Sequence, residues 1–119
     1  MKIISSTFHG FIDYAAAFAL IVAPFFVLPA GAPTIATVFS VAAGTALILY
    51  SLVTDYSISA RKAIPFKLHL LIDFVAGAAF VAAPFILGFD GVTKIYFLVM
   101  GGAVILVVLL TDSNTAEEE

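Results

Sequence analysis

The sequence contains no cysteine and no tryptophan, and only five of its 119 residues are lysine or arginine. The lack of cysteine excludes disulfides, thiolate nucleophiles, iron–sulfur clusters, attached c-type haem and cysteine-based zinc sites. Five cations cannot build the basic stripe that phosphate recognition requires, so we expect no nucleic-acid partner. Any chemistry must therefore come from histidine, carboxylates, hydroxyls and the backbone.

Charged residues of either sign are few, and apolar residues dominate the sequence. Only 11% of the residues are charged, 63% are hydrophobic, and the mean hydropathy is +1.19. Soluble globular proteins are about 25% charged. We therefore expect the lipid bilayer to be the main partner of a single transmembrane domain over residues 1–119, with 113–119 as a solvated acidic tail.

Four apolar runs divide the chain, and each is long enough to cross a bilayer. They cover about residues 8–28, 34–54, 67–88 and 92–111. Twenty helical residues span about 30 Å, the thickness of the hydrocarbon layer. Asp13 inside the first run argues against a cleaved secretory signal there. The runs predict an all-α fold, a four-helix transmembrane bundle.

The two halves of the chain repeat each other. His9 and Asp13 recur sixty residues later as His69 and Asp73, and Ala-Pro-Phe at 23–25 recurs at 83–85. The second helices also align, because LVTD ends at residue 55 and LLTD at residue 112. We therefore predict two parallel two-helix repeats, at about residues 8–55 and 68–112.

The distribution of cations predicts the orientation of the bundle. The end of the bundle that holds the termini and the middle connector carries Lys2, Arg61, Lys62 and Lys67, and the opposite end has only Lys94. Cytoplasmic loops of membrane proteins carry an excess of lysine and arginine. We expect the protein in the cytoplasmic membrane with both termini in the cytoplasm.

Acids and imidazoles gather at this same end. His9 and Asp13 are four residues apart and share a helix face, as do His69 and Asp73. Asp55 and Asp112 close the second helix of each repeat and return to the same layer. The layer therefore holds four carboxylates and two imidazoles, whose charge must be compensated by protons, nearby cations or a bound ion.

Several roles for this layer remain open at this stage. It can be structural, with each histidine sharing its proton with a carboxylate. It can bind a divalent metal ion through His9, Asp13, His69 and Asp73, with Asp55 and Asp112 in support. A haem between the two histidines, or a proton relay, are further alternatives, so the cofactor is unassigned. We do not expect an enzyme, because the sequence contains no recognisable nucleophile with an activating base beside it.

The remaining features favour structural roles. Small residues such as Ala19, Gly44 and Gly101 permit close helix packing and offer faces for a homo-oligomer. Pro24 and Pro84 are expected to kink or end their helices. The tyrosines lie near helix ends, as interfacial anchors do; they are Tyr14, Tyr50, Tyr56 and Tyr96.

The repeated Ala-Pro-Phe, the sequence Ala-Pro-Phe-Ile-Leu-Gly-Phe at 83–89 and the doubled His-x-x-x-Asp motif resemble the SPW-repeat family of small membrane proteins. That family is named for Ser-Pro-Trp in the first helix of each repeat, and here only the proline and an aromatic are kept. The resemblance covers nearly the whole chain. It implies a four-helix integral membrane protein without an assigned activity. For the function itself, our first hypothesis is a structural or interaction role in the membrane.

Overall fold

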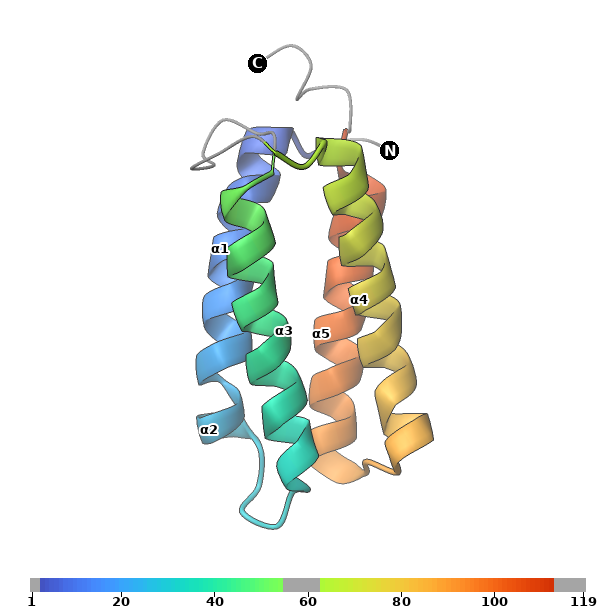
Figure 1. The fold of residues 1–119 in the computed structure, drawn as a ribbon. Helices are drawn as coiled ribbons and strands as arrows, with labels where there is room; N and C mark the ends of the chain where they lie inside the picture. Colours follow the sequence, from blue (N-terminus) through green and yellow to red (C-terminus); the bar gives the residue numbers. More distant parts are fainter. Residues whose placement is uncertain (1–2, 55–62, 113–119) are drawn as a thin grey trace.

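In a computed structural model, which describes residues 3–54 and 63–112, the chain forms five α-helices (Figure 1). They are α1 (Ser6–Val22), α2 (Pro24–Val27), α3 (Thr34–Leu52), α4 (Phe66–Leu87) and α5 (Gly91–Leu110). The four long helices lie side by side, and α1 and α4 begin at the end of the molecule where α3 and α5 finish. Within the described ranges there is no β-strand, only two isolated bridges. The predicted all-α class is confirmed.

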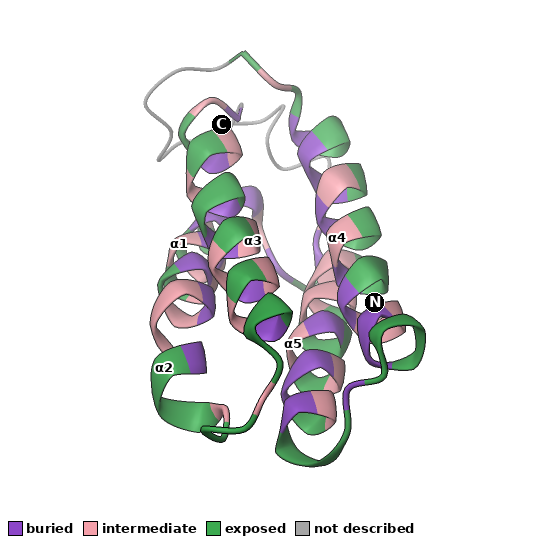
Figure 2. Ribbon diagram, turned by 60° about the horizontal axis from the view of Figure 1, so that its bottom comes forward, coloured by how far each residue is buried: buried purple, intermediate pink, exposed green. Residues whose placement is uncertain are grey.

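The outer surface is apolar and the buried residues include many polar ones. Phe26 is 82% exposed and Ile86 is 78% exposed, whereas His9, Asp13, Ser40 and several threonines are buried. Exposed positions follow the outward side of each helix (Figure 2). Helices α3, α4 and α5 are long and apolar enough to cross a membrane, and α1 is shorter, with 17 residues. This distribution suits a protein surrounded by lipid.

The two prolines interrupt their helices differently. Proline has no N–H and leaves the carbonyl four residues earlier without its helical partner. At Pro24 the helix breaks into α1 and α2, and the freed Leu20 carbonyl accepts a 2.8 Å hydrogen bond from Ser40 Oγ. Pro84 stays inside α4, which ends three residues later at Leu87 and is capped by Gly88 in the left-handed conformation, φ 74°. The predicted run 8–28 is therefore two helices.

Glycines allow the helices to pair closely. Helix α1 packs mainly on α3, and α4 mainly on α5. A Cβ added at Gly44 would lie 2.8 Å from the Ala17 carbonyl oxygen, and one at Gly101 only 2.6 Å from that of Gly77. Both glycines are therefore needed for packing within the chain, as close helix contacts in lipid require.

Hydrogen bonds between backbone segments connect the helix ends. The N–H groups of Ile3 and Ile4, just before α1, donate to the Leu110 carbonyl at the end of α5 (2.8 and 2.9 Å). In the same way Ala63 and Ile64, before α4, donate to the Val53 carbonyl after α3 (2.7 Å each). The start of each histidine-bearing helix is thus held beside the end of α5 or α3.

Candidate metal centre

Four buried side chains converge between α1 and α4. His9 is the fourth residue of α1 and His69 the fourth of α4, and one turn further each helix supplies Asp13 or Asp73. None of the four is more than 4% exposed. One nitrogen or oxygen from each lies within 4.8 Å of those from the other three. The structure therefore brings together the four residues that the sequence singles out, here named the His–Asp quartet.

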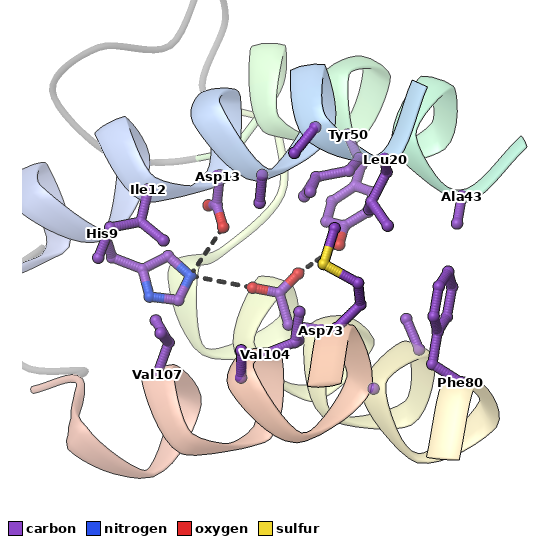
Figure 3. A pocket seen from close by; sticks show the side chains of 17 residues that line it. His9, Ile12, Asp13, Leu20, Ala43, Tyr50, Asp73, Phe80, Val104 and Val107 are labelled. Atoms are coloured by element: carbon purple, nitrogen blue, oxygen red, sulfur yellow. Dashed lines mark hydrogen bonds and ion pairs between the residues drawn. The ribbon is translucent and has the colours of Figure 1, made fainter. Parts of the chain in front are cut away.

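Within the quartet each imidazole faces both carboxylates. Figure 3 shows this arrangement for His9. His9 Nε2 lies 3.1 Å from Asp13 Oδ1 and 2.9 Å from Asp73 Oδ2. His69 Nε2 lies 2.8 Å from Asp13 Oδ2 and 3.2 Å from Asp73 Oδ2. The two Nε2 atoms and the carboxylate oxygens therefore surround one common point rather than forming two separate pairs.

Two threonines determine which nitrogen of each imidazole carries a proton. Thr111 Oγ1 donates to the Val107 carbonyl (2.6 Å), and the same oxygen lies 2.9 Å from His9 Nδ1. A hydroxyl has one proton, so Thr111 can only accept from His9, and Nδ1 must be the donor. Thr54 makes the same two contacts beside His69, so both imidazoles keep a proton on Nδ1 and direct Nε2 into the quartet.

The second threonine has the same geometry. Thr54 Oγ1 donates to the Tyr50 carbonyl (2.6 Å) and lies 2.7 Å from His69 Nδ1. Thr54 and Thr111 are fully buried. Each sits beside its histidine because of the backbone pairing at the helix ends, Ile64 with Thr54 and Ile4 with Thr111.

Tyr50 adds a contact that only one half of the chain can make. Its hydroxyl donates to Asp73 Oδ1, the oxygen that does not face the imidazoles. The corresponding position of the second repeat is Val107, which has no hydroxyl. The two carboxylates are therefore not equivalent, and Asp73 is held with Oδ2 directed at the two histidines.

The structure describes only one of the two aspartates that were expected to support the metal ligands. Asp55 lies outside the described residues. Asp112 is described, and its backbone N–H donates to the Ile4 carbonyl (2.8 Å), but it is not among the described residues that form the quartet. The threonine that precedes each of these aspartates is the one whose hydroxyl meets a histidine.

A cavity of about 190 Å³ lies beside the quartet, between the α1–α3 and α4–α5 pairs. His9, Asp13, Tyr50 and Asp73 line one end of it, and His69 does not. The remaining lining is apolar, with Leu20, Phe80, Met100 and several alanines (Figure 3). We call this space the bundle cavity.

A family model for the SPW repeat domain matches residues 7–111. The chain belongs to the SPW repeat family. The family match, together with the apolar helices, identifies a membrane protein. The matched span includes the whole quartet and both threonines. No curated protein and no solved structure matches the chain.

The sequence did not assign Tyr50 to this site, and it placed Thr54 and Thr111 only at the helix ends of the polar layer, without a contact to the histidines. The tyrosine was expected to be an interfacial anchor, but it contacts Asp73. Another expected anchor, Tyr96, is buried and lies 2.6 Å from Ser40 Oγ. The repeated Thr-Asp at the helix ends was a usable signal for the threonines, since it occurs once per repeat.

Proposed function

We propose that this protein is a four-helix transmembrane bundle of two parallel repeats that binds one divalent first-row metal ion in the His–Asp quartet. We place it in the cytoplasmic membrane, with both termini in the cytoplasm, because the cations gather at that end. The donor set of two imidazoles and two carboxylates suits Zn²⁺, Fe²⁺ and Mn²⁺. We infer binding rather than catalysis, since the sequence offers no nucleophile with an activating base.

The observation that carries the proposal is the direction of the imidazoles. Histidine ligands of metal ions donate their other N–H to an oxygen, which fixes the tautomer and orients the ring. His9 and His69 donate Nδ1–H to Thr111 and Thr54, at 2.9 and 2.7 Å. Tyr50 orients the Asp73 carboxylate in the same manner. All three contacts support the ligands from outside the quartet.

The spacing of the donors also fits an ion. Tetrahedral Zn²⁺ with bonds of about 2.0 Å separates its ligand atoms by about 3.3 Å. The four imidazole–carboxylate distances run from 2.8 to 3.2 Å. Binding therefore requires these contacts to lengthen by a few tenths of an ångström, and the widest pair of the four donor atoms, within 4.8 Å of each other, to move closer.

The competing interpretation is a purely structural quartet, in which protons on Nε2 bind the carboxylates. A proton forms one short, directed bond. Each Nε2 here lies within 3.2 Å of both carboxylates rather than beside a single one, and this arrangement favours a shared ion. A haem is less well supported, because a porphyrin between the two imidazoles would pass through Asp13 and Asp73. A proton relay is disfavoured by the apolar lining beyond the quartet.

Metal analysis of the purified protein tests the proposal. The wild-type chain in lipid nanodiscs, dialysed against buffered zinc, should retain one ion per chain and show a higher melting temperature than after chelation. The double variant His9→Ala/His69→Ala should retain none. Asp112→Asn serves as the matched control, because its side chain lies outside the quartet, and should bind as wild type does.

Two results would overturn the ion site in favour of the structural quartet. One is a wild-type protein that retains no more zinc than the double histidine variant. The other is a wild-type melting temperature that changes with neither zinc nor chelator, together with a His9→Ala variant whose unfolding free energy is lower by about 1–3 kcal/mol both with and without zinc.

A further inference from the structure

The bundle cavity is apolar along most of its length and has one polar end. An engineered apolar cavity of about 150 Å³ is known to bind benzene. The bundle cavity measures about 190 Å³ and therefore has room for a single aromatic ring with a small substituent. Its walls carry small side chains, including Ala16, Ala43 and Ala76, where larger apolar residues would close it.

The polar end accepts hydrogen bonds. The carboxylates of Asp13 and Asp73 are acceptors, and the Tyr50 hydroxyl gives its one proton to Asp73. A molecule in the cavity must therefore present a donor toward the quartet. Its remaining surface must be apolar, to match Leu20 and Phe80.

The charge of the quartet decides between a hydroxyl and an ammonium donor. This step depends on the proposed ion site. Two carboxylates and one dication cancel, so an ammonium group would add an unpaired charge in an apolar space. A neutral hydroxyl adds none. Phe80 and Met100, which also line the cavity, provide the ring and sulfur contacts that aromatic molecules favour.

We propose that the bundle cavity binds a single-ring phenol, with its hydroxyl against Asp13, Asp73 and Tyr50 and its ring among the apolar side chains. His9 lines the cavity and His69 does not, so the ring approaches the quartet from one side only. The ion and the phenol would then occupy adjacent parts of one site.

Fluorine NMR of 4-fluorophenol with the zinc-loaded protein in nanodiscs tests the proposal, with empty nanodiscs to correct for partition into lipid. Wild type should bind it saturably. Fluorobenzene, which lacks the hydroxyl, should bind at least about tenfold more weakly, and so should 4-fluorobenzylammonium. Tighter binding of either probe than of the phenol would overturn the proposal.

Leucine substitutions provide matched variants. Ala43→Leu fills the cavity, and its neighbour Ala42→Leu places the same side chain on the exposed face of α3. The cavity variant should bind 4-fluorophenol at least about tenfold more weakly, with the control within about twofold of wild type. Ala76→Leu and Ala79→Leu form a second such pair on α4, for use if the first fails to fold.

The outcomes separate the two proposals. If zinc binds stoichiometrically but the cavity and control variants bind the phenol equally, the phenol site is refuted and the ion site stands. If zinc is not retained but the phenol binds and both cavity variants lose it, the ion site and the charge argument against an ammonium donor are refuted, and the phenol site stands.

Discussion

Replacing Thr111 by valine should weaken zinc binding sharply without removing a metal ligand. The change keeps the shape of the side chain and deletes the hydroxyl that accepts His9 Nδ1–H at 2.9 Å. Without zinc, His9 can move its proton to Nε2 and donate to a carboxylate. When zinc binds Nε2, the proton must return to Nδ1. Nδ1 is buried, and without the threonine hydroxyl it has no acceptor.

The size of the effect follows from that unmet hydrogen bond. A buried donor left without a partner costs about 1–3 kcal/mol, or about 5- to 150-fold in affinity. Supporting residues of known metal sites change affinity by about 10- to 100-fold. We expect the zinc dissociation constant of Thr111→Val to rise by about 10- to 100-fold, and that of Thr54→Val similarly. Competition titration against a zinc chelator dye would measure both.

Two variants control for the substitution itself. Thr45 makes the same type of bond to a carbonyl four residues earlier, Val41, but is exposed and has no histidine beside it. Thr45→Val should therefore leave zinc affinity unchanged, and Thr111→Ser, which keeps the hydroxyl, should remain near wild type. Equal zinc affinity in Thr111→Val and Thr45→Val would refute the reasoning about the tautomer.

Two further predictions concern contacts around the site and between helices. Tyr50→Phe removes a hydrogen bond to the Asp73 carboxylate and should weaken zinc binding by about tenfold in the same dye titration. Tyr96→Phe removes only the contact with Ser40, so it should lower the unfolding free energy by about 1 kcal/mol and leave zinc affinity unchanged. Gly101→Ala places a Cβ 2.6 Å from a backbone oxygen of α4 and should lower the unfolding free energy by about 1–3 kcal/mol. Gly102→Ala lies in the same helix and meets nothing within 4 Å, so it should leave the unfolding free energy unchanged or raise it by up to about 1 kcal/mol. Equal melting of the two variants would contradict the packing argument.

The sequence predicted the helices and the four quartet residues because both depend on local spacing. Apolar runs of about 20 residues specify helices in lipid, and a four-residue interval places His and Asp on one face. The contacts of Thr111 with His9 were not predictable in this way. They depend on the backbone pairing of Ile4 with Thr111, which joins segments more than 100 positions apart. No periodicity within a helix encodes that pairing.

The bundle cavity depends on differences between the two repeats, which a search for similarity overlooks. Tyr50 corresponds to Val107, and Ala43 to Met100. The first repeat therefore supplies the hydroxyl at one end of the cavity and a small wall residue, while the second supplies bulk. Matching residues build the quartet, because each half of the chain supplies one histidine and one aspartate. Unmatched residues shape the space beside it, because a symmetric pair of large side chains would fill the gap between the helix pairs.

If the quartet holds the proposed ion, the division of the chain into two helix pairs gives that ion a mechanical role as well. Helix α1 packs mainly on α3, and α4 mainly on α5. The quartet takes two ligands from α1 and two from α4, so an ion there would connect the pairs across the interface that holds the cavity. Because buried carboxylates in an apolar setting repel each other strongly, the same interface without an ion must hold protons in its place. Ion content would therefore set how closely the two pairs approach, and with it the volume available to a ligand.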